Sequence, residues 1–244
     1  MNSCLAIYKR ELRAYFATPL AYVFIVIFIA LNAASTFYFG SFFDRGQADL
    51  QPMFGFHPWL YLFLIPALAM RLWAEERKSG TIEVLMTLPV STSQAVAGKF
   101  LAAWAFSCIA LALTFPLWIT VNYLGDPDNG VIVASYVGSM LMAGAYLAIG
   151  SFVSALTRNQ VIAFVIGAAV IFLFMLSSLE IVLAVFQGWA PAFVTDFVQS
   201  LSFLTHYDAV IRGLIDVRDL IFFLSVMGIF LFANIIMVDL KREA

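Results

Sequence analysis

Long runs without a charged side chain dominate this 244-residue sequence. A charge at the centre of a bilayer costs about 2.5 to 3.5 kcal/mol, and a spanning helix needs about 20 apolar residues. Backbone groups in hydrocarbon must also be satisfied internally, which unalternated runs can achieve only as helices. We therefore expect an all-α membrane protein, a single domain over 1–244 with six transmembrane helices. The six uncharged runs are 14–43, 50–70, 100–125, 129–157, 159–179 and 220–238.

The basic residues predict the orientation, because short cytoplasmic loops carry an excess of Lys and Arg. If the N-terminus is inside, only Arg45, Arg212 and Arg218 of the 13 basic residues fall outside. Six spans would then return the C-terminus to the cytoplasm. The first run is far longer than the apolar core of a signal peptide, so we expect it to be a retained span.

Residues 1–18 have the pattern of an amphipathic helix lying on the inner leaflet. Apolar and basic side chains fall on opposite sides of a helical wheel: Leu5, Tyr8, Leu12, Tyr15 and Phe16 against Lys9, Arg10 and Arg13. Thr18-Pro19 would end this helix and open the first span. The alternative is an ordinary basic flank of that span.

A polar segment, 71–99, separates the second and third apolar runs. We expect two short helices in it. Thr81 can cap the first, with Glu83 in its opening turn and Pro89 after its end. Its apolar face includes Leu85, and so short a helix is marginal alone in water, so it should be held by a partner or by the membrane surface.

The second of these helices should begin at a capping box and lead into the third span. Ser91 and Gln94 have the S-x-x-Q spacing in which each side chain bonds the other residue's backbone N–H. Further along, small residues in the fourth run permit close helix packing, above all Gly138, Gly144 and Gly150. In the second run, Pro58 and Pro66 predict a kink.

The outer segment 186–218 is too apolar for a free linker. Four large side chains recur at helical spacing after Pro191: Phe193, Phe197, Leu201 and Leu204. We expect this stripe to fold back as one or two short helices and to form a lid at the outer end of the spans, because an exposed apolar face of this size needs a partner or lipid.

The sequence predicts no catalytic, cofactor or metal site in this chain, and no enzyme activity. His57 and His206 are expected to be interfacial or packing residues rather than ligands. Glu180 should lie near the outer interface, where a transport role is the alternative. Cys4 and Cys108 are not expected to meet, and they carry no redox motif. Because a phosphate-binding loop is also missing, the energy for any uphill transport must enter from another chain.

The run from Glu76 to Ser91, ERKSGTIEVLMTLPVS, resembles the E-x-x-x-G-T-x-E-x-L-x-x-x-P-[VI]-S motif between the second and third spans of type-2 ABC transporter permeases. The stretch from His206 to Asp219 is similar to the outer loop of one subgroup, which contains the gliding-motility permease GldF and the nitrous-oxide-reductase maturation permease NosY. The resemblance covers nearly the whole chain.

The resemblance implies that residues 81–88 are a coupling helix that docks into a cytosolic ABC ATPase subunit. The motif positions carried over are Glu76, Arg77, Gly80, Thr81, Glu83, Leu85 and Pro89. ATP and Mg²⁺ would bind that partner, and this chain would hold no cofactor.

The implied assembly contains two permease chains and two ATPase chains in a bacterial inner membrane. The second permease chain is either identical or a related subunit, a periplasmic accessory protein is a further implied partner, and nucleic acid is not expected. The implied transport is export. Two other functions stay open: a membrane scaffold that anchors a cytosolic partner without transport, and an ion-coupled carrier.

Overall fold

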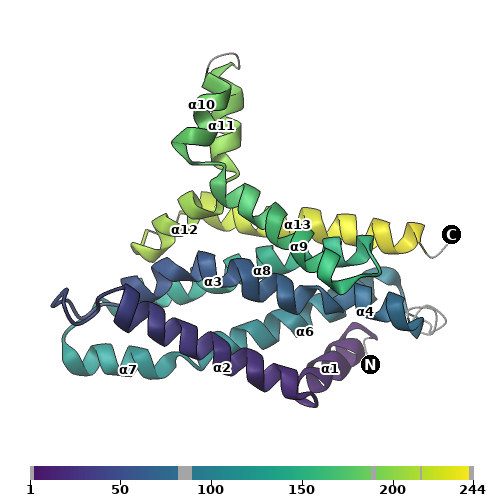
Figure 1. Ribbon diagram of the computed structural model, residues 1–244, viewed down its shortest axis with the longest axis horizontal. Coiled ribbons are helices and arrows are strands. Elements are labelled where there is room, and N and C mark those ends of the chain that lie inside the picture. The colour runs from purple at the N-terminus through teal and green to yellow at the C-terminus, as the bar shows by residue number, and fades with distance from the viewer. Residues whose placement is uncertain (1–2, 82–89, 188–190, 215, 242–244) are drawn as a thin grey trace.

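The computed structural model describes residues 3–81, 90–187, 191–214 and 216–241, and within these ranges the chain is helical with no strand. Most of the helices lie roughly along one direction, in a single elongated bundle (Figure 1). The helices are α1 (Ser3–Phe16), α2 (Pro19–Ala34) with a π-helical turn at Ser35–Phe39, α3 (Gln51–Ala69), α4 (Arg71–Ser79), α6 (Thr92–Ala112), α7 (Phe115–Leu124), α8 (Asn129–Leu156), α9 (Gln160–Leu176), α10 (Glu180–Gln187), α11 (Ala192–Ser200), α12 (Phe203–Ile211) and α13 (Val217–Leu240).

Five helical stretches of the described chain are long and apolar enough to cross a membrane. They are Ala21–Phe39, Gln51–Ser79, Thr92–Leu124, Asn129–Leu156 and Val217–Leu240. The expected fifth span, 159–179, is shorter than predicted because α9 ends at Leu176. The hydroxyl of Ser177, the first residue after α9, donates to the carbonyl of Phe174 at 2.8 Å. Six spans therefore remain a prediction.

Three other boundaries differ from the uncharged runs. The first run includes the end of α1, and Thr18-Pro19 separates α1 from α2 as predicted. The second span extends as α4 through the charged residues to Ser79. The third span begins at Thr92 and is interrupted at Leu113 and Thr114. Pro116 follows directly, and it has no backbone N–H with which to continue the helical hydrogen bonds.

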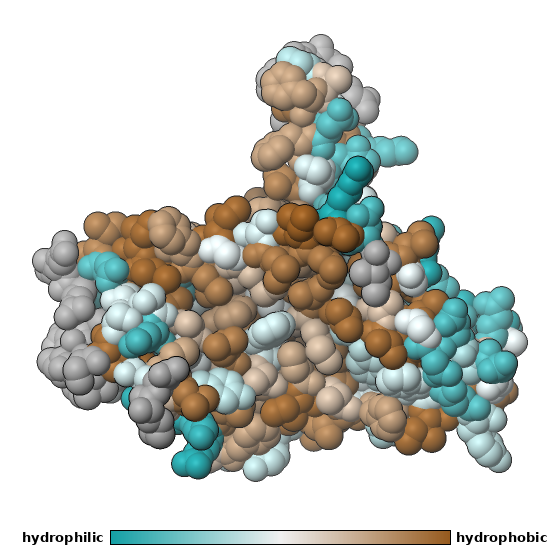
Figure 2. Space-filling view, turned by 180° about the vertical axis from the view of Figure 1, so that it is seen from behind, coloured by the Kyte–Doolittle hydropathy of each residue, from teal (hydrophilic) through white to brown (hydrophobic). Residues whose placement is uncertain are grey.

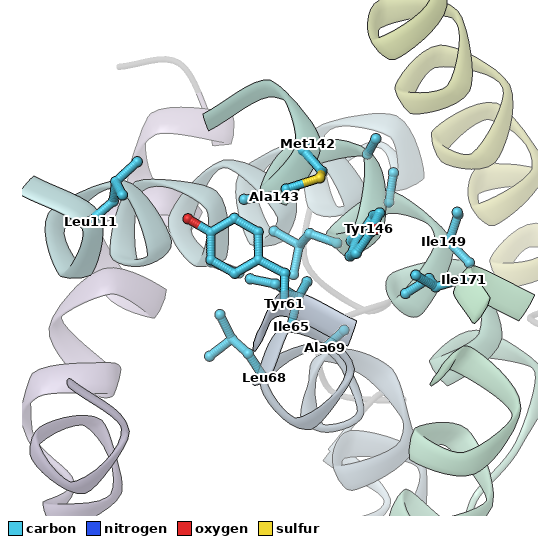
Figure 3. Packing of buried hydrophobic residues seen from close by; sticks show 14 of the residues in the cluster. Tyr61, Ile65, Leu68, Ala69, Leu111, Met142, Ala143, Tyr146, Ile149 and Ile171 are labelled. Carbon is cyan, nitrogen blue, oxygen red and sulfur yellow. The ribbon is translucent and has the colours of Figure 1, made fainter. Parts of the chain in front are cut away.

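Helix α8 is the centre of the bundle. It contacts α3, α4, α6, α9, α12 and α13, and most of its residues are buried. Figure 3 shows how Tyr61 and Ile65 of α3 meet Met142 and Tyr146 of α8 in the core. The first half of α8 leaves Val133 and Val137 exposed, whereas every residue from Met142 to Ser151 is buried.

Glycines on α8 allow its neighbours to approach closely, as the sequence predicted. A Cβ at Gly138 would lie 2.6 Å from Val210 of α12, and one at Gly144 would lie 2.7 Å from the sulfur of Met227 in α13. A Cβ at Gly150 would lie 2.5 Å from the Cβ of Ala69 in α3. Each of these glycines therefore allows a different helix to pack closely against α8.

The two chain ends lie at the same end of the bundle, next to α4 (Figure 1). We call this the polar end, because charged side chains from α1, α4, α6 and α13 meet there. Apolar side chains cover the middle of the face seen in Figure 2, while hydrophilic ones gather toward its edges. An apolar belt between two polar edges is the surface of a helical membrane protein.

A hairpin of α10 and α11 projects sideways from the bundle (Figure 1). None of the α11 residues is buried. The chain then returns along α12, which packs on α8 and α3 through Phe203 and Tyr207. The apolar segment thus forms short helices, as expected.

The contact at Gly150 gives a stability prediction. Gly150→Ala would place a methyl group against Ala69, and overpacking of this kind costs about 1 to 3 kcal/mol. We expect a lower melting temperature of the purified protein in detergent. Gly228→Ala is the matched control, because Gly228 lies in α13 with no atom within 4 Å of the added Cβ. It should melt at the wild-type temperature or slightly above, since Ala favours helix. Equal effects of the two substitutions would contradict this account of α8.

Candidate functional site

The conspicuous charged motif begins on α4, at the polar end of the bundle. Glu76 and Arg77 lie in the last turns of α4, and Gly80 ends the helix with a left-handed backbone, φ 74°. Glycine adopts this conformation without the steric cost that other residues incur. The remaining motif positions, Glu83, Leu85 and Pro89, and with them the predicted coupling helix, lie outside the described residues.

The flanks of the motif differ in how well they were predicted. The capping box is confirmed: Gln94 N–H donates to Ser91 Oγ at 3.3 Å, and Ser91 N–H donates to Gln94 Oε1 at 3.4 Å. The hydroxyl of Thr81 contacts the preceding helix. It lies 2.9 Å from Ser79 Oγ and donates to the carbonyl of Glu76 at 3.4 Å. The start of the loop is therefore tied back to α4.

Ser154 of α8 joins α4 to the bundle at the break between α3 and α4. Its hydroxyl accepts from the backbone N–H groups of Trp73 and Ala74, at 3.1 and 3.0 Å, and donates to the carbonyl of Met70 at 2.9 Å. The first N–H groups of a helix have no intrahelical partner, so this serine acts as a cap supplied by another helix. The start of α4 is thereby fixed to α8.

Trp73 extends this attachment into the core. Its indole is fully buried, and Nε1–H donates to Ser151 Oγ at 3.3 Å. Asn234 of α13 donates to the same hydroxyl at 2.7 Å. One serine of α8 therefore links α4 with α13.

A buried lysine forms the second attachment of α4. Lys99 of α6 donates to Glu76 Oε1 at 2.7 Å and to Glu11 Oε1 of α1 at 3.3 Å, and its side chain is only 3% exposed. Its ammonium also lies 5.6 Å from the centre of the Trp73 ring. We call Glu11, Glu76 and Lys99 the Lys99 triad. It joins three helices that are distant in sequence.

The cations around Glu11 favour its ionised form. Burial alone would raise the pKa of Glu11, but the nearby Lys99 ammonium and Arg10 guanidinium outweigh it and hold this pKa below its ordinary value. One oxygen of Glu76, Oε2, is buried without a hydrogen-bond partner among the described residues. Lys99 is therefore the cation that Glu11 and Glu76 share, while Arg10 pairs with Glu11 alone.

The third attachment of α4 is at the end of α8. Arg77 donates to the carbonyl of Ala155 at 2.8 Å, and Lys241 donates to the carbonyls of Ala155 and Leu156 at 3.1 and 2.7 Å. The last carbonyls of a helix lack intrahelical donors and carry partial negative charge, so cations stabilise them. Two cations from α4 and from the end of α13 thus converge on one helix terminus.

These contacts define what the site can do. Helix α4 is bonded to α8 at its start, to Lys99 of α6 through Glu76, and again to α8 through Arg77, while the same Lys99 bonds Glu11 of α1. A force applied to the loop after Gly80 would therefore reach the bundle through fixed polar contacts rather than through a flexible linker. Lys78, Ser79, Gly80 and Thr81 are exposed at the mouth of this loop.

Sequence reasoning found Glu76 and Arg77 but not their partners within the chain. Lys99 was grouped with the basic flanks, and Glu11 was not singled out. A lone lysine at the edge of an apolar run is a signal, because a buried ammonium requires acidic partners. Which acids supply them depends on the fold.

The two histidines are held by protein groups, in agreement with a packing role. His57 is fully buried and hydrogen-bonded to Ser139 and Asn32, at 2.7 Å each. His206 Nε2–H donates to the carbonyl of Ser200 at 3.0 Å, and Nδ1 lies 2.6 Å from Asp219. His206 thereby ties α12 to the start of α13.

The predicted outer lid residues divide into two pairs. Phe193 and Phe197 of the projecting hairpin are 72% and 62% exposed in the single chain. Leu201 and Leu204 are partly buried, and Leu204 packs against the core. Glu180 is exposed at the first turn of α10.

Removing the buried ammonium should destabilise the polar end. Lys99→Met would leave Glu11 and Glu76 without their shared cation, at a cost of about 3 to 5 kcal/mol for a broken buried pair. We expect a lower melting temperature and faster hydrogen exchange in α1 and α4. Lys78→Met is the matched control, since Lys78 is exposed on α4 and its loss should change stability by at most about 0.5 kcal/mol.

A triple variant separates lost charge balance from lost packing. Glu11→Gln and Glu76→Gln in the Lys99→Met background remove the uncompensated carboxylates. They should recover most of the lost stability. If the Lys99→Met and Lys78→Met variants have the same melting temperature, the triad does not hold the helices together.

The comparisons with known proteins agree with this membrane architecture. The family described as ABC-2 family transporter protein matches the chain over residues 5–238. No curated protein matches it. The family match extends from α1 through all the described helices to the last turn of α13. By this match over nearly its whole length, the chain belongs to the ABC-2 family of transporter proteins, a family of membrane transport subunits that generally work with a cytosolic ABC ATPase.

Proposed function

We propose that this chain is the transmembrane permease subunit of an ATP-driven transporter whose ATPase is a separate cytosolic chain. The observation that carries the proposal is the attachment of α4 at three points, to Ser154 of α8, to Lys99 of α6 and to the end of α8, directly before the exposed residues 78–81. A subunit that only anchored a partner would not need the loop fixed to the centre of the bundle. The scaffold is the weaker alternative for this reason.

The polar attachments suggest how ATPase movement would become permease movement. Residues 81–88 would dock on the ATPase, with Glu83, Leu85 and Pro89 shaping that helix. Closure of the ATPases around ATP and Mg²⁺ would move the loop, and α4 would carry α8 with it. Coupling of this kind is a rigid-body transition between two packed arrangements.

The proposed assembly has two permease chains, identical or related, and two ATPase chains in a bacterial inner membrane. Both termini and the loop after α4 would face the cytoplasm, with six crossings if α9 and the segment after it complete the fifth. The similarity to the GldF and NosY subgroup favours export or a mechanical task with a periplasmic accessory protein.

The projecting hairpin is proposed as the outer lid of the path between two permease chains. Phe193 and Phe197 leave a large apolar surface exposed in one chain, which requires lipid or a second chain to cover it. Leu201 and Leu204 connect this surface to the packed α12.

A charge in the coupling helix tests the proposed function. Leu85→Asp would place an unpaired carboxylate in the ATPase contact, which costs several kcal/mol if desolvated. We expect co-purification with the ATPase to fall at least tenfold while the membrane yield is unchanged. Ser79→Asp adds the same charge to the exposed end of α4 and is the matched control.

Two outcomes would count against the transporter. Undiminished co-purification of Leu85→Asp would remove residues 81–88 from the interface. ATPase activity in liposomes that no lipid or other substrate stimulates, with docking intact, would favour the scaffold.

Cysteine labelling tests the proposed orientation. In a background of Cys4→Ser and Cys108→Ser, single cysteines at Gly46 and Ser200 should react with an impermeant thiol reagent from the periplasmic side. A cysteine at Ser79 should react only after the cells are opened. All three positions are exposed in the structure, so access depends on the membrane alone. Reaction at Ser79 in intact cells would invert the topology.

A further inference from the structure

His206 lies at the base of the projecting hairpin, where α11, α12 and α13 meet. It belongs to α12, and its side chain is only 17% exposed. Nδ1 lies 2.6 Å from Asp219 Oδ1 in the first turn of α13, and Nε2 lies 3.0 Å from the carbonyl oxygen of Ser200, the last residue of α11. One imidazole therefore joins the end of the hairpin to α12 and α13.

Both groups that face the imidazole are acceptors. The carbonyl of Ser200 has only lone pairs, so Nε2 must carry a proton for this bond. An ionised Asp219 also only accepts, so Nδ1 must carry a second proton. A neutral imidazole has one N–H and can make only one of the two bonds, whereas an imidazolium makes both. The two contacts therefore require one proton more than neutral His206 and ionised Asp219 hold.

The surroundings favour this proton on the imidazole rather than on Asp219. The carbonyl of Ser200 belongs to the end of α11, where carbonyls lack intrahelical donors and carry partial negative charge. The ring of Phe222 is stacked on His206 with 4.1 Å between the centroids, which suits a cation over an aromatic face. The contact with Asp219 is short, as charge-assisted hydrogen bonds are.

We propose that His206 is a proton-dependent attachment for the projecting hairpin, in which the imidazolium bonds Asp219 and Ser200 at once. Loss of one proton to water would leave a single N–H, which would stay on the charged Asp219. Nε2 would then point a lone pair at the carbonyl oxygen of Ser200, and this contact would be repulsive. We call the position of the hairpin in the structure the docked position. Protonation favours it, and the hairpin is released as the pH rises through the range of about 5 to 8 in which histidine changes charge.

The hairpin is an arm that one contact at its base can control. Helices α10 and α11 pack on each other, and none of the α11 residues is buried. A second contact at the base joins Ser202 Oγ to Ser178 Oγ at 2.8 Å. Serine does not titrate in this range, so of these two contacts only that of His206 depends on pH.

Other titratable and charged groups lie on the elements around α12, but apart from Asp219 none of them has a bond to His206 in the described part of the chain. Burial raises the pKa of Asp208, two residues from His206, while Arg212 lowers it. Helices α8 and α9 contain no charged residue. The remaining groups are Glu180 of α10, Asp196 of α11, Tyr207 of α12, Asp216, Arg218 and Asp239 at or in α13, His57 and Tyr61 of α3, and Tyr136 and Tyr146 of α8.

The inference rests on the fold of residues 191–214 and 216–241 and not on the ATPase contact. In the orientation proposed above, His206 would lie on the outer side of the membrane. Acidity of the outer compartment would then favour the docked hairpin.

The protonation state can be measured directly, because the sequence has only two histidines. The full chain is labelled with ¹⁵N-histidine and placed in nanodiscs at about pH 5. We expect NMR to show one imidazole with both nitrogens protonated, which His206→Gln should remove, and one neutral imidazole. The neutral one is His57, since the Ser139 hydroxyl can donate to Nδ1 and the Asn32 amide oxygen accepts from Nε2.

Distances between two spin labels measure the position of the hairpin. The labels are attached at Ala192→Cys in α11 and Leu224→Cys in α13, with Cys4→Ser and Cys108→Ser, and both labelled positions are exposed. We expect one narrow distance distribution at about pH 5 and a broader, shifted one at about pH 9, on the two sides of the histidine range. His206→Gln is neutral throughout and should give the same distribution at both pH values.

Asp219→Asn separates a proton-dependent attachment from an ordinary ion pair. The new amide N–H can donate to Nδ1 while Nε2–H still donates to Ser200, so neutral His206 makes both bonds. We therefore expect the narrow distribution at both pH values. If the pair were only a structural ion pair, this substitution would loosen the hairpin instead. Asp208→Asn is the matched control and should leave the pH response of the wild-type chain unchanged.

Three results would overturn the proposal. The first is a wild-type distance distribution that is the same at about pH 5 and about pH 9. The second is a pH response that persists in His206→Gln or in Asp219→Asn, which would assign it to another group. The third is a neutral His206 in the NMR spectrum while the hairpin is docked, and this measurement needs no variant that could fail to fold. None of these measurements involves the ATPase, so co-purification reports separately on the proposed function.

Discussion

The buried ammonium of Lys99 holds together the end of the molecule from which the charged loop emerges. It bonds Glu76 at 2.7 Å and Glu11 at 3.3 Å, so one cation joins α6 to α4 and to α1. Removing Lys99 leaves Glu76 without its cation in a poorly solvated site. This interaction therefore requires the three helices to stay in one arrangement, and the rest of the polar end is built around it.

Serines and small residues on α8 supply the complementary constraint. Ser151 and Ser154 satisfy groups on α4 that apolar surroundings would leave unbonded. Gly150 lets α3 approach within van der Waals contact. Helices in lipid gain little from apolar burial against one another, so close packing and interhelical hydrogen bonds carry their association. Helix α8 provides both the close packing and the interhelical hydrogen bonds, and its contacts fix the position of α4.

This arrangement gives the first residues of the motif a structural role within the chain. Glu76 and Arg77 come shortly before the predicted coupling helix in the sequence, and their described contacts are with Lys99 and with the end of α8. They hold the base of the loop. Gly80 and Thr81 begin the exposed part, and the proposed ATPase contact belongs to the residues beyond them.

The sequence by itself determined the membrane class, the helical architecture, the amphipathic start, the capping box and the family motif, because each depends on local periodicity or short spacing. It gave the fifth run a few residues more than α9, which ends at Leu176, and it missed the continuation of the second span through α4. Only the tertiary structure decided that Lys99 meets Glu11 and Glu76, and that Cys4 and Cys108 line one groove between α1 and α6. Those pairings join residues far apart in the chain, and the relative placement of α1, α4 and α6, set by packing on α8, creates them.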